Sequence, residues 1–398
     1  MPHYKYLIVG GGMTAHAAAR GVREADSEGS MGLISAEENP PYNRPSLSKG
    51  LWKGEALERI WLGTEKQNVT LHLGRQAQSL DPSKKMVRDD QGSVYTFEKL
   101  LLATGATPRR LPFDDGSIIY FRTLGDYRKL RALTEQSRRA AVIGGGFIGW
   151  EIAAALAMNG KEVVMLFPEE GIGALLYPIE LARFLNDYYR QKGVNVVAGS
   201  MVVGLEKKNQ GRLVKTRSHG EFLVDAVVAG IGVTPNVELA RSAGLAVDNG
   251  IVVDEFLRTS VPDVYAAGDV ANFFSPALEK RLRAEHEDNA NTMGREAGRA
   301  MAGKAKPYYH LPFFYSDLFD LGYVAVGELD RRLETFADWK EPHHEGVVYY
   351  LREARVRGVL LWNVWGQIDE ARQLIAAPGP FRGTDLKGYL PKPRGKRR

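Results

Sequence analysis

Two glycine-rich turns constrain the fold of this chain more than any other feature, because each follows a short apolar strand and opens a helical stretch. Both fit the dinucleotide-binding pattern G-x-G-x-x-G/A, in which the first glycine makes a tight turn, the second admits a pyrophosphate and the third position lets helix and strand pack closely. The pattern positions are Gly10, Gly12 and Ala15 in the first turn, and Gly144, Gly146 and Gly149 in the second. A single match is weak, since such glycines can be purely structural. Two well-placed matches predict two nucleotide-binding βαβ units.

Two acidic residues follow the second strand of the later unit. Glu169 and Glu170 come directly after the apolar strand 163–167 and Pro168. A carboxylate at this place accepts ribose hydroxyls and repels a 2′-phosphate, so the pattern favours NADH over NADPH. The alternative is that both acids only cap a loop.

The earlier unit offers less regular ligand contacts. Its second strand, 31–35, is not followed directly by an acid, so Glu37, Glu38 or another group would hold the ribose. Much later, residues 259–270 predict a strand that delivers Asp269 at its carboxyl end. Ligand contacts gather at that edge of an α/β sheet, and a carboxylate there can accept hydrogen bonds from a polyol such as the ribityl chain of a flavin. The alternative is an aspartate that caps the next helix.

The order of these segments predicts a discontinuous first domain. The first nucleotide unit would occupy residues 1–112 and 234–312, and the second, 113–233, would be inserted within it. From 313 to 398 the sequence becomes aromatic and alternating, which favours antiparallel strands with a closing helix at 368–376. We therefore expect an α/β protein with two Rossmann-like dinucleotide-binding domains, one inserted in the other, plus a C-terminal α+β domain.

The composition excludes several kinds of redox site. The chain contains no cysteine, which excludes disulfides, thiolate metal sites and iron–sulfur ligation. Any redox chemistry must therefore use a cofactor. No run of about 18 apolar residues occurs, so we expect no membrane-spanning helix. Met1 stands only a few residues before the first strand, which leaves no room for a signal peptide, and we expect a cytoplasmic location.

The charge balance is mildly basic. The net charge of +5 and the pI of about 9.1 favour acidic partners slightly. The tail from Lys387 to Arg398 is basic and interrupted by proline and glycine, which is typical of a mobile, solvated end. We do not expect it to bind nucleic acid, because no aromatic residues alternate with the basic ones to stack on bases.

The chain resembles the FAD-dependent ferredoxin and rubredoxin reductases of the pyridine nucleotide-disulfide oxidoreductase family, and within it the members similar to apoptosis-inducing factor. The resemblance covers nearly the whole chain. It is carried by the stretches 41–49 (PYNRPSLSK), 145–151 (GGFIGWE), 166–169 (LFPE), 235–240 (PNVELA), 285–286 (EH) and 312–318 (PFFYSDL). The resemblance implies FAD in the first unit, NADH in the inserted unit and a β-rich C-terminal domain.

The resemblance also assigns residues to each cofactor. The flavin-site positions are Arg44, Lys49, Arg122, Asp269 and His286, and the nicotinamide-side positions are Gly145, Phe147, Glu151, Glu169, Gly232 and Glu285. Arginine forks suit the phosphate oxygens of a diphosphate. Lys49 can favour an electron-rich reduced flavin, and Glu151 can supply the counter-charge that a buried ammonium needs, so we expect both to act in hydride transfer. The alternative is that the two side chains are exposed and never meet.

The chain departs from the family pattern at three places. Tyr315 stands where close relatives have a tryptophan against the flavin; a tyrosine can still stack, but it is smaller. Glu287 and Asn289 replace histidines of that pattern, and the loop 341–346 is short. Two adjacent histidines within this loop predict a polar turn rather than a metal site.

These expectations combine into one function and one alternative. We expect an FAD-dependent NADH oxidoreductase in which hydride passes from NADH to flavin N5. Without a cysteine pair, electrons would leave directly to a ferredoxin, rubredoxin, quinone or other acceptor, and the basic pI suits a small acidic electron-transfer protein. The alternative is an apoptosis-inducing-factor-like interaction protein that is controlled by reduction and turns over slowly. The sequence leaves open a monomer and a homodimer, including one formed only with NADH.

Overall fold

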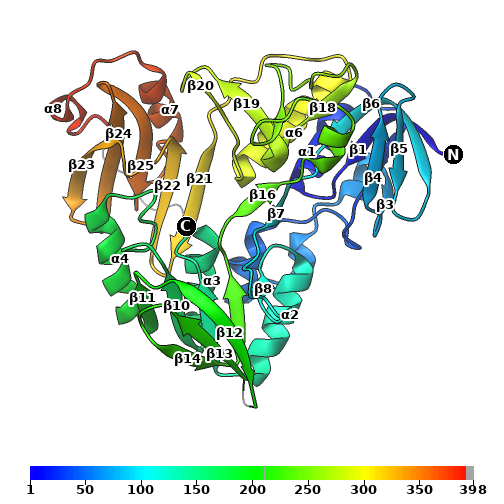
Figure 1. Ribbon diagram of the computed structural model, residues 1–398. Helices are drawn as coiled ribbons and strands as arrows, with labels where there is room; N and C mark the ends of the chain where they lie inside the picture. The colour runs from blue at the N-terminus through cyan, green and yellow to red at the C-terminus, as the bar shows by residue number, and fades with distance from the viewer. Residues whose placement is uncertain (210, 391–398) are drawn as a thin grey trace. The chain divides into compact units, whose positions relative to one another are not determined.

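The computed structural model describes residues 1–209 and 211–390, and the chain divides into two compact units (Figure 1). The first unit consists of residues 1–43, 57–107 and 234–312, and the second of residues 44–56, 108–233 and 313 onward. The chain passes into the second unit through β7 (Ala106–Pro108) and returns through β16 (Val233–Pro235). The expected boundaries placed residues 44–56 with the first nucleotide domain; in the structure they pack within the second unit.

The first unit is built on a seven-stranded sheet. Five strands run parallel, and β4 and β5 add an antiparallel edge. The strands are β3 (Thr70–His72), β2 (Met31–Ile34), β1 (His3–Val9), β6 (Val94–Leu102), β5 (Met86–Asp89) and β4 (Ala77–Asp81), with β18 (Val264–Ala266) beside β6. Leu7 and Ile8 of β1 are fully buried, as expected for a strand that is covered on both faces.

Helices α1 (Met13–Arg23) and α6 (Glu287–Met301) pack closely because glycines remove side chains at their contact. A Cβ on Gly298 would lie 2.0 Å from the carbonyl oxygen of Ala18, and a Cβ on Gly21 would lie 2.0 Å from that of Arg295. The unit also contains α5 (Glu238–Ser242) and a small sheet of β17 (Ile251–Val252), β19 (Ala271–Ser275) and β20 (Lys280–Leu282).

The second unit contains a five-stranded parallel sheet and two antiparallel sheets. The parallel strands are β11 (Val194–Ala198), β10 (Glu162–Phe167), β9 (Arg139–Ile143), β15 (Ala226–Ala229) and β8 (Ile119–Tyr120), with helices α2 (Leu124–Gln136), α3 (Phe147–Met158) and α4 (Ile179–Gln191). Most of α3 is apolar and buried, so this helix lies in the interior of the unit. The smaller antiparallel sheet consists of β12 (Val202–Lys208), β13 (Gly211–Thr216) and β14 (Glu221–Val224).

The larger antiparallel sheet follows residue 313, with its strands side by side in Figure 1. Its strands are β21 (Phe313–Leu318), β22 (Leu321–Gly327), β25 (Arg355–Trp362), β24 (Glu345–Arg352) and β23 (Glu334–Glu341), followed by α7 (Ile368–Ala376) and α8 (Gly383–Leu386). Burial alternates along β21, so Ser316 points to the interior and Asp317 does not. The predicted closing helix 368–376 is confirmed. The end of the basic tail, 391–398, lies outside the described residues.

The predicted fold class is confirmed: the protein is α/β, with two Rossmann-like parallel sheets and a C-terminal antiparallel sheet. Within the described ranges, none of the helices combines the length and the apolar character that crossing a bilayer requires.

Candidate functional site

The glycine turn of the second unit has the shape of a pyrophosphate cradle. Gly144 has a φ of +117°, and a Cβ on it would lie 2.3 Å from the carbonyl oxygen of Gly230. A Cβ on Gly149 would lie 2.0 Å from the carbonyl oxygen of Gly144, so helix α3 sits directly on the turn. A Cβ on Gly146 would meet nothing within 4 Å, which leaves room for a phosphate group at the helix N-terminus. These residues fit a dinucleotide.

The two acids after β10 have different surroundings. Glu170 forms an exposed ion pair of 2.8 Å with Arg183, whereas no side chain of the described residues donates to the Glu169 carboxylate. A Cβ on Gly145 would lie 2.9 Å from the ring of Phe167, so the glycine turn rests against the end of the strand that delivers Glu169. Glu169 is therefore the better placed acid for ribose hydroxyls.

Gly232 lies at the same edge of the parallel sheet as the glycine turn. Gly144 packs against Gly230 and Ile231, the two residues that immediately precede Gly232. Gly232 has a φ of +89°, and its carbonyl oxygen accepts a hydrogen bond of 2.9 Å from the backbone N–H of Arg109. The carboxyl ends of β9 and β15 thus meet where ligands of such sheets bind.

The glycine turn of the first unit brings Asp269 close to helix α1. Gly10 has a φ of +131°, and a Cβ on it would lie 2.0 Å from the carbonyl oxygen of Ala103. Ala15 is fully buried, which explains a small residue at the third pattern position. A Cβ on Gly268 would lie 2.2 Å from Oγ1 of Thr14, so Asp269 follows a residue in direct contact with the first turn of α1. This arrangement fits FAD: the helix N-terminus would hold its pyrophosphate, and a role of Asp269 toward the ribityl chain stays a prediction.

Of the two acids after β2, Glu37 is the better held. The hydroxyl of Tyr42 donates to Glu37 Oε2 at 2.6 Å, and Glu37 is partly buried, whereas Glu38 is exposed. A Cβ on Gly11 would lie 2.0 Å from Ser35 Oγ, so the glycine turn lies against the end of β2. Glu37 is thus the better candidate of the two, and its contact with the adenosine ribose stays a prediction.

His286 occupies the N-cap position of α6 in the first unit, without a capping hydrogen bond from its side chain. Burial lowers the pKa of His286 to about 4, against the opposing effect of Asp269 and Asp288. The imidazole is consequently neutral near pH 7, and one ring nitrogen donates while the other accepts.

Arg283 is a residue of the first unit that the sequence analysis missed. Its Nη1 donates to the backbone oxygen of Asp269 at 3.0 Å and forms an ion pair with Glu285. Its side chain is largely buried. Arg283 therefore links two of the predicted site residues, and a lone arginine in the sequence gives no signal of such a role.

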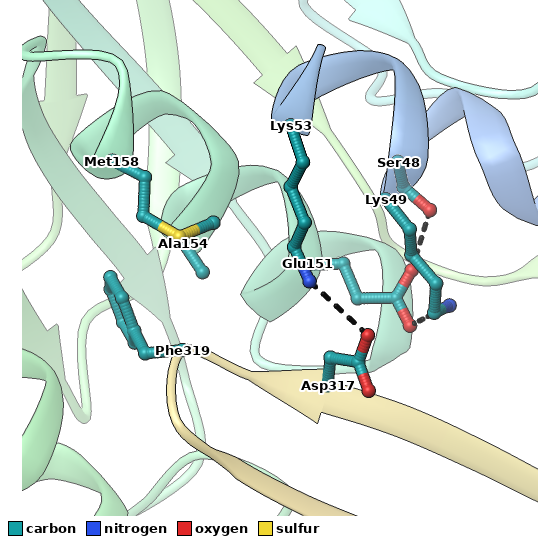
Figure 2. A pocket seen from close by; sticks show the side chains of 8 residues that line it. All are labelled: Ser48, Lys49, Lys53, Glu151, Ala154, Met158, Asp317 and Phe319. Carbon is teal, nitrogen blue, oxygen red and sulfur yellow. Dashed lines mark hydrogen bonds and ion pairs between the residues drawn. The ribbon is translucent and has the colours of Figure 1, made fainter. Parts of the chain in front are cut away.

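The Glu151 carboxylate lies at the centre of a buried network in the second unit (Figure 2). Lys49 Nζ and Ser316 Oγ each donate to Oε1 at 2.6 Å, and Ser48 Oγ donates to Oε2 at 2.5 Å. Trp150 Nε1 donates to Ser316 Oγ at 3.0 Å, so this hydroxyl both accepts and donates. The side chains of Lys49 and Glu151 are only 17% and 6% exposed. The ammonium has its counter-charge, and the carboxylate accepts three hydrogen bonds.

Three elements bring these side chains together. Glu151 lies in the second turn of α3, Ser316 points inward from β21, and Lys49 follows the short 3-10 helix Pro45–Leu47. Lys49 Nζ also lies 5.2 Å from the ring centroid of Tyr315, a cation–π distance. Lys49 and Glu151 belong to one unit, whereas the expected domain boundaries placed them in two. Their part in hydride transfer stays a prediction.

The remaining predicted positions of the second unit form two further contacts. Arg44 Nη1 donates to the backbone oxygen of Arg122 at 3.0 Å, next to the N-terminus of α2. Phe147 makes edge contacts with Trp150 and Phe314, with ring centroids 4.9 and 5.3 Å apart. Phe147 is thus held by aromatic rings at the start of α3.

The two histidines of the short loop lie against aromatic rings. His343 and His344 both contact the ring of Phe184, with centroids 5.2 and 5.1 Å away. Within the part of the chain that the structure describes, no three histidine, aspartate or glutamate residues are grouped as metal ligands.

Two nucleotide cradles, one suited to FAD and one to a nicotinamide dinucleotide, define a flavoprotein oxidoreductase. Residues 4–294 match the model of the pyridine nucleotide-disulphide oxidoreductase family, and the chain belongs to that family. Residues 297–345 and 337–377 match the model of the C-terminal domain of mitochondrion-associated apoptosis-inducing factor.

The relatives are similar over nearly the full chain. Apoptosis-inducing factor 1, mitochondrial, of Dictyostelium discoideum is 34% identical over 94% of this chain and 78% of its own length. The ferredoxin reductase subunit of the 5,5′-dehydrodivanillate O-demethylase of a Sphingobium species is 35% identical over 89% of both chains. The covalent putidaredoxin reductase–putidaredoxin complex contains a chain of 30% identity that superposes with a TM-score of 0.88 over 94% of both chains. The protein is an NAD(H)-dependent FAD oxidoreductase, and its predicted cofactors, FAD and NAD(H), are confirmed.

Proposed function

We propose that this protein takes hydride from NADH onto FAD and passes the electrons to a small, acidic iron–sulfur protein. The observation that supports this most directly is the similarity to a ferredoxin reductase subunit along 89% of both chains. The neighbouring structure in which a reductase is linked to putidaredoxin supports a protein as electron acceptor. The basic pI of about 9.1 suits an acidic partner.

The lack of cysteine separates this chain from a disulfide-reducing mechanism. Many redox flavoproteins relay electrons through a pair of thiols, but these 398 residues contain none. Electrons must therefore pass from the flavin directly to the acceptor. When bound, FAD supplies the conversion between two-electron and one-electron transfer that no side chain of this chain can perform.

The side chains bind and orient the reactants in this proposal. The turn at Gly146 admits the pyrophosphate of NADH, and Glu169 accepts its ribose hydroxyls. In this proposal the Lys49 ammonium, which is paired with Glu151, would favour the electron-rich reduced flavin. Phe147, fixed by its aromatic contacts, positions the nicotinamide.

Anaerobic stopped-flow reduction followed by turnover with an added ferredoxin tests the proposal. We expect rapid bleaching of the flavin by NADH, slower bleaching by NADPH and steady-state reduction of the iron–sulfur protein. Rapid reduction with negligible turnover on ferredoxin, rubredoxin, quinone and dye acceptors alike would contradict a reductase function.

The similarity to apoptosis-inducing factor along 94% of this chain favours a second candidate function. In that case NADH reduction would change assembly or partner binding, and turnover would be slow. Sedimentation velocity with and without NADH under anaerobic conditions distinguishes the two: an NADH-dependent dimer without appreciable turnover supports the second candidate.

A further inference from the structure

A pocket open to solvent lies against the Lys49–Glu151 pair (Figure 2). Both residues line it, together with Ala154 one turn further along α3. Lys53 and Asp317 also line the pocket and form an ion pair of 3.3 Å across it. The pocket has room for about one water molecule; Ala154, Met158 and Phe319 form the apolar part of its wall, and the charged side chains would be the polar partners of that water.

The exposure of the charged side chains increases along the pocket. Glu151 is 6% exposed and Lys49 is 17% exposed, whereas Lys53 and Asp317 are 46% and 44% exposed. The two pairs therefore connect a buried carboxylate with the surface. An ion pair as exposed as the outer one is weak in water, so it opens readily.

Both lysines belong to one short segment of the chain and face strand β21. Lys49 and Lys53 are separated by one turn of the short helical segment, and the residues that they face, Tyr315 and Asp317, are two apart on β21. Residues two apart on a strand point to the same face. The segment that carries the lysines and strand β21 thus place the outer ion pair next to Lys49, and both lysines line the pocket.

We propose that this pocket is the route by which the proton of NADH oxidation leaves the site; this rests on the proposed function. NADH gives NAD⁺, two electrons and one proton. Two one-electron acceptor molecules take the electrons but not the proton, which must reach bulk water. One proton enters the Lys49–Glu151 pair, another leaves it to water in the pocket, and Asp317 at the rim passes it outward. The pair is unchanged after each NADH.

A proton-release measurement tests the route. The FAD-loaded protein is reduced anaerobically with one equivalent of NADH and mixed with ferricyanide, a one-electron acceptor, in weak buffer with a pH-indicator dye. Flavin absorbance reports electron loss, and the dye reports the proton. We expect one proton per NADH, released together with flavin oxidation in the wild type.

Two variants obstruct the route in different ways. Ala154→Leu fills the pocket beside Glu151, and Asp317→Asn removes the carboxylate at the rim. We expect the dye signal to lag behind flavin oxidation by at least about tenfold in both, because positioned proton-transfer groups contribute roughly 10²–10⁴ to rates. Met158→Leu, a nearly volume-conserving change on the same pocket wall that leaves the space beside Glu151 open, is the control and should show no lag. Coincident dye and flavin signals in Ala154→Leu would overturn the proposal.

Chemical labelling provides a second readout that needs no electron transfer. Reductive methylation of the amines with ¹³C-formaldehyde, read by mass spectrometry, measures how accessible each lysine is. We expect Ala154→Leu to slow labelling of Lys49 at least about fivefold relative to Lys53, and unchanged relative labelling would overturn the route. If NADH fails to reduce the flavin, the proposed function is wrong, whereas the labelling result still decides whether the pocket leads to Lys49.

Discussion

Ser316 on β21 donates a hydrogen bond of 2.6 Å to the Glu151 carboxylate on α3 and accepts one of 3.0 Å from the indole of Trp150. All three side chains are buried. A hydroxyl donates one proton and accepts through its lone pairs, so Ser316 donates to Glu151 and accepts from Trp150 at the same time. The C-terminal sheet thereby fixes the position of the carboxylate that holds Lys49.

We expect Ser316→Ala to destabilise the protein and to loosen Glu151. The substitution leaves the buried Trp150 N–H without an acceptor, which costs about 1–3 kcal/mol of unfolding free energy. Urea unfolding of the holoprotein measures this cost, and stopped-flow reduction by NADH should become a few-fold slower.

Ser48→Ala is the matched control for Ser316→Ala, because it also removes one hydrogen bond to Glu151 but leaves no donor of the described network unsatisfied. We expect it to cost about 1 kcal/mol or less. Equal destabilisation by the two substitutions would show that the Trp150–Ser316 bond contributes nothing. Ser316→Thr, which keeps the hydroxyl, should restore the reduction rate.

Lys49 and Glu151 should shift the flavin midpoint potential in opposite directions. Lys49→Met removes a positive charge and should lower the potential, whereas Glu151→Gln leaves the ammonium without its counter-charge and should raise it. Reduction by NADH should slow by at least about tenfold in Lys49→Met. Tenfold is a lower bound, because removing one group that stabilises developing charge usually reduces the rate by more than that.

Spectroelectrochemical titration of the single variants and the double variant measures this coupling. The pair is in direct contact, so the effects should be non-additive by about 0.5–3 kcal/mol. Additive effects, or potentials equal to that of the wild type, would remove the pair from the flavin site.

The sequence was most informative where the determinants are local. The two glycine turns were predictable because a tight turn, a phosphate cradle and a close helix–strand contact each demand a small residue at a fixed place. Gly10, Gly146 and Gly149 illustrate these three demands in the structure. The closing helix and the strands after residue 313 were predictable from their periodicity.

Long-range contacts were predictable only by resemblance or not at all. Lys49 and Glu151 are 102 positions apart, and Ser316 is 165 positions from Glu151. A single serine has no pattern that announces a partner so far away. Chain order predicted that residues 44–56 belong to the first domain. In the structure the ring of Trp52 packs on that of Tyr127 in α2, with the ring centroids 5.6 Å apart. Tertiary packing therefore decides the position of this segment.

The neutral imidazole of His286 predicts a specific dependence of stability on pH. Its pKa is about 4 in the folded protein and about 6.5 in the unfolded chain. A depressed pKa contributes stability above pH 6.5, and this contribution is lost as the pH falls from about 6.5 to about 4, because only the unfolded chain then takes up the proton. Below pH 4 no further loss occurs.

The difference in unfolding free energy between wild type and His286→Gln should therefore fall by about 2–3 kcal/mol from pH 7 to pH 4, because one unit of pKa difference corresponds to about 1.4 kcal/mol. NMR of the ring protons, assigned by their loss in His286→Gln, should show no titration between pH 8 and 5. A midpoint near 6.5 would contradict the assignment of a neutral imidazole.

Glu169 should determine the choice between the two nicotinamide dinucleotides, and Glu170 should contribute indirectly. We expect Glu169→Arg to reduce the ratio of kcat/KM for NADH over NADPH at least about tenfold, equivalent to about 1.4 kcal/mol, because a repelling carboxylate is replaced by a group that binds a phosphate.

Glu170→Gln is the matched control, since it releases Arg183 from its exposed ion pair and should raise NADPH use by a smaller factor. If Glu170→Gln raised the use of NADPH more than Glu169→Arg did, Arg183, which Glu170 neutralises, would set the preference rather than Glu169. Equal use of NADH and NADPH by the wild type would contradict both roles, because two carboxylates beside a bound 2′-phosphate must weaken its binding.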